Sequence, residues 1–397
     1  MVIWQIIFWL SLVCIVHPYV LYAWILQRMA RGRKANEVCY SLEDVDNLPR
    51  VSIMMAVYNE EHVLEQKIES LFDTSYPLEK VEVLIGSDSS TDHTHQILDR
   101  LEAKYTPLSY RIFSPRKGKP TILNALQQEA KGEIYLFTDA NVFFTAHSIY
   151  ELVKHFKNKR ISQVGANFLN QNSKDEGIAL QEKSYIRRET SIKYNEGLIW
   201  GTMMGGFGGC YALRASDFVP NPPNFIVEDF YISMKVLGSG QKAILEPKAV
   251  VYEDVSVNMR EEFRRKVRIS TGNFQNLKVF YPLLFPPFSG LAFSFLSHKV
   301  LRWLGPFFIL SALLSSGVVG IGKTNTFYLI LFFAQIFSLL IIPVLNFLLQ
   351  RMHVHIVLIR YIAYFNAMNL ALLTGFFKYL KGVKTNVWQP TKRNIRS

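Results

Sequence analysis

The stretch GEIYLFTDANVFF (residues 132–144) decides the fold, because a short apolar run in it breaks off at an acid and an amide. Residues 134–137 have the length and composition of a buried strand. Asp139 and Asn141 follow almost at once, and the chain then becomes apolar again. Parallel sheets covered on both faces have such continuous apolar strands, and their ligands bind at the carboxyl ends of the strands. The stretch therefore predicts an α/β fold with a polar strand end facing a ligand.

Two earlier apolar runs end in the same way. RVSIMMAVYN (50–59) and VEVLIGSDSS (81–90) both finish in polar residues. The segments that follow them, EEHVLEQKIESLF (60–72) and DHTHQILDRLEAKY (92–105), have the apolar spacing of amphipathic helices. Strands that alternate with such helices indicate a mostly parallel sheet covered by helices. We therefore expect three polar strand ends at one edge of the sheet.

The first two strand ends each have a structural interpretation beside the functional one. Asn59 could cap the helix that follows, with Glu60 on the helix dipole, or this strand end could bind a nucleotide base or ribose. At the second strand end, Asp92 is well placed to cap the next helix. That arrangement leaves Asp88 for a ligand.

Two basic segments could bind phosphate. In PRKGKPTILNALQQEAKG (115–132), three cations surround Gly118 just before a helix, where they fit a phosphate or form a solvated loop. The spacing of a P-loop is missing. In EEFRRKVRISTGNFQNL (261–277), four cations at helical spacing either face lipid headgroups or hold a departing diphosphate.

An acidic pair supplies a candidate for proton transfer. In NFIVEDFYISMKVLGSG (224–240), Glu228 and Asp229 begin a predicted helix. Acids there either favour the helix dipole or include a general base that takes a proton from an attacking hydroxyl. The glycine-rich residues 201–209 come just before this pair and would let the backbone approach a ligand closely.

The composition argues against a purely soluble protein. Hydrophobic residues make up 49% of the chain and charged residues only 19%, against about 25% in typical soluble domains. The formal net charge is +12, but the basic residues cluster beside apolar segments, which fits headgroups and diphosphates better than nucleic acid. The 3 cysteines lie far apart, so neither a disulfide framework nor a zinc site is indicated.

The apolar segments divide the chain into five expected regions. Residues 1–27 contain no acid, lysine or arginine and are long enough for a retained transmembrane anchor, and residues 301–380 hold three more spans. Between them we expect a catalytic domain at 49–255, followed by a basic helix and an interfacial segment at 256–300. A basic tail at 381–397 ends the chain.

The charges that flank these segments predict a topology with one conflict. The basic cluster from Arg28 to Lys34 places the catalytic domain in the cytoplasm of a multi-pass protein of the cell membrane. One anchor and three spans would then leave the basic tail outside, against the same rule. Three explanations stay open: one span is re-entrant, the interfacial segment crosses, or the tail is an exception.

An ordered set of motifs, AVYNEE, SDSSTD, KGKPTILNAL, TDAN, VEDF and RRKVRISTG, resembles that of the membrane-bound family 2 glycosyltransferases. That group includes cellulose, chitin, hyaluronan and poly-N-acetylglucosamine synthases. The resemblance covers residues 50–277 and extends to the flanking membrane segments. It implies a GT-A fold and an inverting transfer from a nucleotide sugar, usually a UDP-sugar, to a lipid-linked or glycan acceptor in cell-envelope polysaccharide synthesis. It also implies a divalent cation, Mg²⁺ or Mn²⁺, and no nucleic acid.

The resemblance assigns roles to individual residues. Asp229 resembles the base of the Glu228–Asp229 pair, and Arg268 is expected to stabilise the leaving diphosphate. Asp139 and Asn141 resemble the metal-binding acid pair of the family. The residues expected to bind the nucleotide sugar are Ala56, Tyr58, Glu60, Asp88, Lys119 and Arg265.

Departures from the family pattern leave alternatives open. Ser87 replaces the first acid of the second motif, and Asn141 replaces the last acid of the metal motif. The processive synthases carry a Gln-x-x-Arg-Trp signature, which here keeps Arg268 but has Arg265 and Ile269 at its ends. A processive synthase of an N-acetylglucosamine polymer or a hyaluronan-like product is therefore the alternative to single additions. An inactive membrane scaffold is the third possibility.

Overall fold

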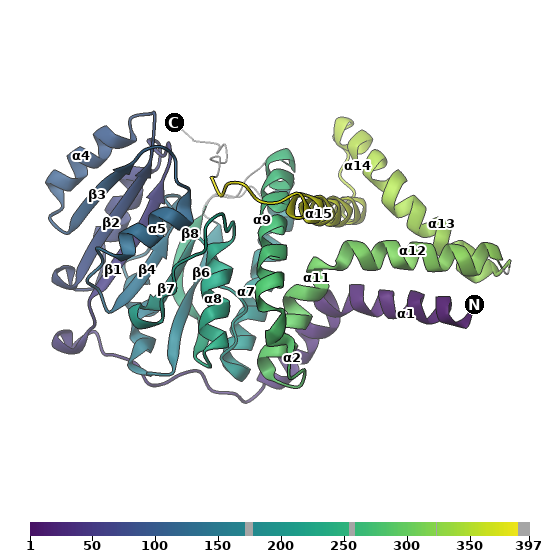
Figure 1. The fold of residues 1–397 in the computed structure, drawn as a ribbon, viewed down its shortest axis with the longest axis horizontal. Coiled ribbons are helices and arrows are strands. Elements are labelled where there is room, and N and C mark those ends of the chain that lie inside the picture. The colour runs from purple at the N-terminus through teal and green to yellow at the C-terminus, as the bar shows by residue number, and fades with distance from the viewer. Residues whose placement is uncertain (171–177, 254–258, 323, 388–397) are drawn as a thin grey trace. The chain divides into compact units, whose positions relative to one another are not determined.

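The computed structural model describes residues 1–170, 178–253, 259–322 and 324–387, which form two compact units. One unit consists of Leu26–Glu261, Val279–Ser294 and Val383–Ser397, and the other of Met1–Ile25, Glu262–Lys278 and Phe295–Gly382 (Figure 1). The expected end of the catalytic domain at residue 255 and the tail beyond residue 387 lie outside the described residues. The five predicted regions therefore stay predictions in their boundaries.

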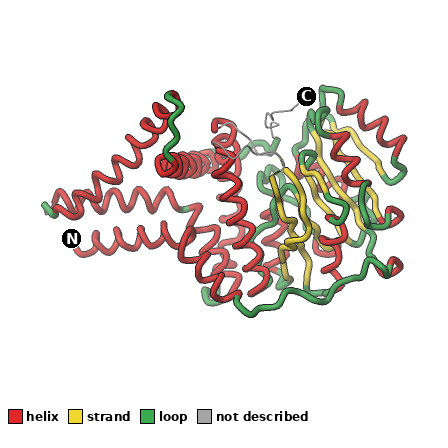
Figure 2. Tube along the Cα trace, turned by 180° about the vertical axis from the view of Figure 1, so that it is seen from behind, coloured by secondary structure: helices red, strands yellow, loops and turns green. Residues whose placement is uncertain are grey.

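The first unit is built on an eight-stranded sheet in the order β3-β2-β1-β4-β7-β6-β8-β5. Figure 2 shows the strands confined to this unit, among the described residues. The strands are β1 (Val51–Val57), β2 (Val81–Asp88), β3 (Leu108–Phe113), β4 (Ile134–Thr138), β5 (Val142–Phe144), β6 (Ile161–Asn170), β7 (Cys210–Arg214) and β8 (Lys242–Glu253). The helices of this unit include α3 (Leu64–Phe72), α4 (Thr94–Lys104), α5 (Lys119–Gln127), α6 (Ser148–Val153), α7 (Ile178–Trp200) and α8 (Glu228–Gly238).

The parallel half of the sheet follows the prediction. Strand β1 lies between β2 and β4 and is parallel to both, so their carboxyl ends meet at one edge. The other half differs, because β7 runs antiparallel to both β4 and β6, and β5 runs antiparallel to β8. The sheet is therefore mixed, with the predicted site at the edge where β1, β2 and β4 end.

Strand β1 is apolar along its whole length because both of its faces are covered. All seven of its residues are buried. Ile53 and Met55 belong to one core together with Leu64 of α3, whereas Met54 belongs to a second core with Ile122 of α5. Side chains alternate between the two faces of a strand, so β1 contributes to the core on each side of the sheet. Neither face carries the polar residues that a half-exposed strand would show.

The second unit is helical in its described part. Its longer elements are α1 (Val2–Val16), α9 (Met259–Phe280, shared with the first unit), α12 (Gly305–Gly322), α13 (Thr326–Ile336), α14 (Ile342–Arg351) and α15 (Val357–Leu380). Four helical stretches are long and apolar enough to cross a membrane: Val2–Ala30, Gly305–Gly322, Thr326–Arg351 and Val357–Leu380. By length and composition they match the anchor and the three further spans expected from the sequence.

Helix α1 packs against the C-terminal helices through aromatic and small residues. Phe8 forms a buried cluster with Ala312 and Val319 of α12, and the Trp9 indole N–H donates to the Tyr328 hydroxyl at 3.1 Å. Small side chains let apolar helices approach closely. The N-terminal helix is thus part of the helical unit rather than a free anchor.

Candidate active site

The ammonium of Lys119 joins three segments at the carboxyl edge of the sheet. Its Nζ lies 2.7 Å from Asp139 Oδ1 and 2.9 Å from Glu228 Oε1, and it donates to the Gly208 carbonyl at 3.3 Å. These partners come from the end of β4, the start of α8 and the glycine-rich loop. The predicted residues Lys119, Asp139 and Glu228 therefore form one cluster, although they are far apart in the sequence.

The two carboxylates keep Lys119 charged. Burial lowers the pKa of Lys119, but the charges of Asp139 and Glu228 outweigh it and hold the pKa above its usual value. The Asp139 side chain is 36% exposed, whereas that of Glu228 is 9% exposed. A permanent cation with one accessible carboxylate beside it is a suitable environment for a diphosphate with a bound metal ion.

The pKa of Asp229 is raised in this site. Burial raises it to about 6, and the negative charge of Glu228 acts in the same direction, while Lys119 opposes both. Glu228 itself pairs with Lys119. General bases work best when their pKa lies near the operating pH. The role of Asp229 as the base stays a prediction.

Gly208 lets the backbone lie directly against Asp229. A Cβ atom at Gly208 would lie 2.7 Å from Asp229 Oδ2, closer than real contacts allow. The same residue's carbonyl accepts from Lys119. The glycine-rich loop therefore contributes one defined contact to the site, where the sequence showed only an irregular glycine pattern.

The loop before Lys119 is fixed by Asp88. The Asp88 side chain is fully buried and accepts from the Lys117 N–H at 2.6 Å, the Gly118 N–H at 3.3 Å and Arg116 Nε at 3.3 Å. Asp88 thus positions the segment that leads into α5. The predicted contact of Asp88 with a base or ribose stays a prediction, because its carboxylate faces the protein here.

The first strand end lies beside this loop. The guanidinium carbon of Arg116 lies 3.4 Å from the centre of the Tyr58 ring, a cation–π contact. Ala56 is buried at the end of β1, and the Glu60 N–H donates to Thr94 Oγ1 at 3.0 Å. These contacts bring the expected nucleotide-binding residues to one edge, together with Arg116, to which the sequence gave no individual role.

The structural interpretation of Asn59 is wrong, and that of Asp92 is confirmed only in its hydrogen bond, because the N-cap residue of α4 is His93. Helix α3 begins only at Leu64, and Asn59 Oδ1 instead accepts from the Thr91 N–H at 2.8 Å, which ties the first two strand ends together. Asp92 Oδ1 accepts from the N–H of Thr94 at 3.0 Å, where α4 begins.

The expected metal ligands are not equally placed. Asp139 is accessible beside Lys119, whereas the Asn141 amide is buried and donates to Glu253 Oε1 of β8 at 3.1 Å. Among the described residues there is no group of three His, Cys, Asp or Glu side chains that could hold a metal ion. Mg²⁺ and Mn²⁺ need few protein ligands when substrate phosphates and water complete the shell. Asp139 fits such a cation, and the role of Asn141 stays a prediction.

The two predicted arginines lie in the helical unit. Arg265 Nε donates to the fully buried Glu262 at 2.8 Å, and Lys266 Nζ lies 3.2 Å from the same carboxylate. Arg268 follows on the same helix, α9. The roles of Arg265 and Arg268 toward a substrate in the sheet-containing unit stay predictions.

The sequence patterns gave no role to Lys67, whose ammonium contacts both ends of the turn that contains Asp139. Its side chain is fully buried, and its Nζ donates to Thr138 Oγ1 at 2.9 Å. A signal was present, because Lys67 lies on the apolar stripe of α3 that includes Leu64, Ile68 and Leu71. A lysine on such a stripe needs a buried partner.

Comparison with known proteins identifies the family of the domain that carries this site. Residues 52–218 match the sequence model of Glycosyl transferase family 2. The chain contains a family 2 glycosyltransferase domain. The family expected from the motifs is therefore confirmed, and the matched range includes Lys119 and Asp139 but ends before Glu228.

Individual relatives extend the comparison. The probable glycosyltransferase YdaM of Bacillus subtilis is 30% identical over 114 residues, 28% of this chain and 27% of that protein. The poly-beta-1,6-N-acetyl-D-glucosamine synthase of Staphylococcus aureus is 22% identical over 251 residues, 61% of this chain and 60% of the synthase. The first match thus spans about a quarter of YdaM, and the second spans about three fifths of the synthase.

A solved structure shows the fold. The mannosyltransferase PcManGT of Pyrobaculum calidifontis, solved in complex with GDP-Man and Mn²⁺, has a TM-score of 0.69 to this chain at 18% identity. The likeness covers 95% of this chain and 99% of that one. The predicted GT-A fold is confirmed, with antiparallel strands in its second half.

A methyl group at Gly208 should impair catalysis more than folding. We expect Gly208→Ala to push the Asp229 carboxylate or the loop out of place and to lower turnover of a nucleotide sugar about 100-fold, because small displacements of reacting groups have effects of that size. The matched control is Gly238→Ala. Gly238 is the last residue of α8, whose first turn carries Asp229, and a Cβ atom at Gly238 meets only ordinary contacts at 3.5 Å. Equal activity of the two variants, measured as nucleoside diphosphate release, would contradict the contact.

Proposed function

We propose that this protein is an inverting glycosyltransferase that moves a sugar from a nucleotide sugar to an acceptor at the membrane, in the synthesis of an envelope polysaccharide or glycolipid. One observation carries the proposal: Lys119, Asp139, Glu228 and Asp229 meet at the carboxyl edge of a GT-A sheet. A fixed cation, an exposed carboxylate and a base with a raised pKa are the groups that this reaction needs.

The proposed chemistry is one displacement. The acceptor hydroxyl attacks the anomeric carbon, the bond from that carbon to the diphosphate oxygen breaks, and Asp229 takes the hydroxyl proton. Lys119 donates hydrogen bonds to the departing diphosphate and balances its developing charge. A divalent cation, when bound at Asp139, would supply further charge neutralisation to the diphosphate. Arg268 is proposed as a second cation for the leaving group.

The donor is proposed to be a nucleoside diphosphate sugar, with UDP as the carrier that the family resemblance implies. PcManGT was solved with GDP-Man and Mn²⁺, which supports a nucleotide sugar and a divalent cation as a class. The Arg116–Tyr58 pair and Asp88 form the proposed base and ribose end of this site.

The acceptor separates the main proposal from its alternative. Similarity to a poly-N-acetylglucosamine synthase supports a processive enzyme. Arg265 and Ile269 stand where processive synthases have Gln and Trp, which supports single additions to a lipid-linked or glycan acceptor. A scaffold without activity is the weakest alternative, because Asp88, Asp139, Glu228 and Asp229 are retained together.

We also propose a topology that places both the catalytic domain and the C-terminal residues in the cytoplasm. Residues 383–387 belong to the same compact unit as the sheet, and Asn386 is buried with its Oδ1 only 2.2 Å from where a Cβ of Gly118 would lie. A compact unit lies on one side of a membrane, so the chain between residues 294 and 383 crosses an even number of times. Three single crossings in this region conflict with that condition.

Helix α15 is the segment that we propose not to cross. It packs against the basic helix α9, where Ser270 Oγ donates to the Leu372 carbonyl at 2.9 Å and the rings of Phe274 and Phe376 are 5.0 Å apart. It is the least apolar of the four candidate stretches. Figure 1 shows α15 end-on while α12, in the same unit, lies along the plane of the view. An interfacial α15 would leave the N-terminal span, α12 and α13–α14 as the crossings.

Asp229 should control the pH dependence of transfer. With a pKa of about 6, it is protonated and inactive as a base at lower pH, so kcat/KM should fall as the pH drops below about 6. Asp229→Asn should lose about 10²–10⁴-fold in kcat. Glu65→Gln, which changes an exposed acid paired with Arg100, is the control. Turnover of Asp229→Asn close to wild type would remove the assignment of the base.

Metal binding should depend on nucleotide. Because Asp139 is the more accessible of the two described carboxylates that pair with Lys119, we expect Mn²⁺ to bind weakly alone and at least tenfold more tightly with UDP present, when diphosphate oxygens complete the shell. Asp139→Asn should abolish this gain in a calorimetric titration. Equal Mn²⁺ affinity with and without UDP or GDP would contradict the role of Asp139.

The C-terminus should be cytoplasmic. A fluorescent protein fused after Ser397 should fluoresce, and alkaline phosphatase fused there should be inactive, because the proposed topology has three crossings. Phosphatase fused after Gly322, between α12 and α13, should be active and is the matched control. An active phosphatase at the C-terminus would show that α15 crosses.

A further inference from the structure

A buried lysine outside the proposed catalytic groups contacts both ends of the turn that carries Asp139. Lys67 lies on α3, and its side chain is fully buried. Its Nζ donates to Thr138 Oγ1 at 2.9 Å and to the Val142 carbonyl. Thr138 is the last residue of β4 and Val142 the first of β5, so the two contacts span the three-residue connection that contains Asp139.

Phe144 supplies a third partner. The Lys67 Nζ lies 4.0 Å from the centre of the Phe144 ring, which is on β5 just beyond the turn. An ammonium has three donors, and two acceptors with one ring face account for all of them. Moving a lysine out of water is costly unless its donors are satisfied, so this full set of partners indicates a built contact rather than a trapped side chain.

The turn has other contacts besides those of Lys67. Lys119 pairs with the Asp139 carboxylate, and the Asn141 amide donates to Glu253 Oε1. The Asp139 N–H donates to the Gly209 carbonyl at 3.0 Å, and the Val142 N–H donates to the Asp139 carbonyl at 3.2 Å. The first bond fixes where the turn begins, and the second closes it. Lys67 lies on α3. Among the described contacts, those of its ammonium join the two ends of the turn, Thr138 and Val142.

We propose that Lys67 is a positioning residue that clamps the Thr138–Val142 turn and so fixes Asp139 for the metal-bound diphosphate. The inference rests on the proposed function for its ligand, but the clamp itself rests only on the contacts. It acts through Asp139 and makes no contact with substrate.

The protonation state of Lys67 does not decide the clamp. Burial lowers the pKa of Lys67 to about 7, while the nearby Cys210 thiol and Asp139 carboxylate oppose the shift. A neutral amine still has two N–H donors, which are enough for Thr138 Oγ1 and the Val142 carbonyl. The clamp can therefore persist on either side of neutral pH.

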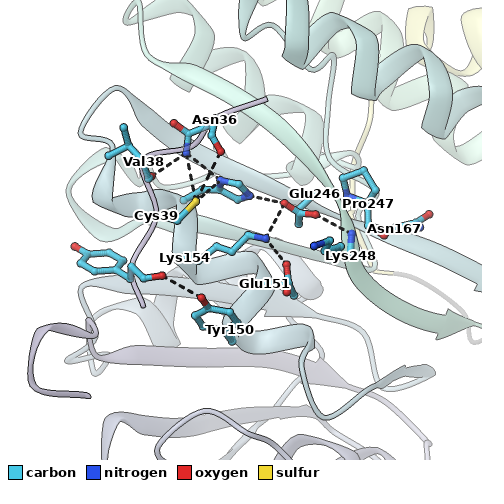
Figure 3. A network of polar contacts seen from close by, with 12 residues as sticks. Asn36, Val38, Cys39, Tyr150, Glu151, Lys154, Asn167, Glu246, Pro247 and Lys248 are labelled. Atoms are coloured by element: carbon cyan, nitrogen blue, oxygen red, sulfur yellow. Dashed lines mark hydrogen bonds and ion pairs between the residues drawn. The ribbon is translucent and has the colours of Figure 1, made fainter. Parts of the chain in front are cut away.

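The test compares Lys67→Met with a matched lysine elsewhere in the same domain. Methionine keeps most of the side-chain volume and removes every N–H donor. The control is Lys154→Met, because Lys154 is also largely buried but contacts Glu151 and Glu246 in a separate network with His155 (Figure 3). Both full-length variants are studied in detergent at a temperature where each is folded.

Two measurements distinguish positioning from a purely structural role. Amide hydrogen exchange over residues 139–142 should become at least tenfold faster in Lys67→Met and stay unchanged in Lys154→Met. Calorimetric affinity for Mn²⁺ with UDP should fall about tenfold in Lys67→Met alone, and the KM for the donor should rise by more than kcat falls. Unchanged exchange and affinity in Lys67→Met, with only a lower Tm, would overturn the proposal.

A second variant covers a failure of Lys67→Met to fold. Thr138→Val removes one of the two acceptors with little change in volume, and it should give a smaller change of the same kind. Wild-type exchange and affinity in Thr138→Val would overturn the clamp. If the wild-type protein binds neither UDP nor GDP with Mn²⁺, the proposed function fails, and the exchange of residues 139–142 then decides the clamp by itself.

Discussion

The site depends on one largely enclosed cation, Lys119, among three acids. Asp139, Glu228 and Asp229 lie at the same sheet edge, and the negative charge of Glu228 contributes to the raised pKa of Asp229. The ammonium of Lys119 offsets two of these charges directly. Loss of Lys119 would leave the buried Glu228 carboxylate without a compensating charge. The Asp88 carboxylate, which fixes the loop before Lys119, and the carbonyl of Gly208 both hold this cation in place.

The fold was largely predictable because local patterns encode it. A strand covered on both faces must be apolar throughout, so β1, β2 and β4 were visible in the sequence, and parallel strands bring their carboxyl ends together. The contacts between loops were not predictable, because they depend on tertiary placement. The sequence could not show that the Asp88 carboxylate accepts from the backbone of the loop before Lys119, or that Asn59 accepts a hydrogen bond from Thr91. It also could not show that β7 enters the sheet in the antiparallel direction.

The helical unit limits how the enzyme can meet its acceptor. In the proposed topology the sheet and residues 383–387 lie on one side of the membrane, so an even number of crossings separates residues 294 and 383. An interfacial α15 would then remove the conflict between tail charge and span number. Helix α9 carries the basic cluster and packs against α15. A membrane-proximal acceptor is consistent with this arrangement, whereas the short helical unit gives no independent support for a polymer channel.

The central claim is that the Lys119 cluster is a diphosphate site. The most direct measurement is an experimental structure of the full chain with UDP or GDP and Mn²⁺. We expect a diphosphate oxygen within hydrogen-bond distance of Lys119 Nζ, Mn²⁺ on the Asp139 carboxylate, and Asp229 facing the space where an acceptor hydroxyl would approach. A nucleotide bound elsewhere, with Lys119 still closed between Asp139 and Glu228, would contradict the proposed diphosphate site.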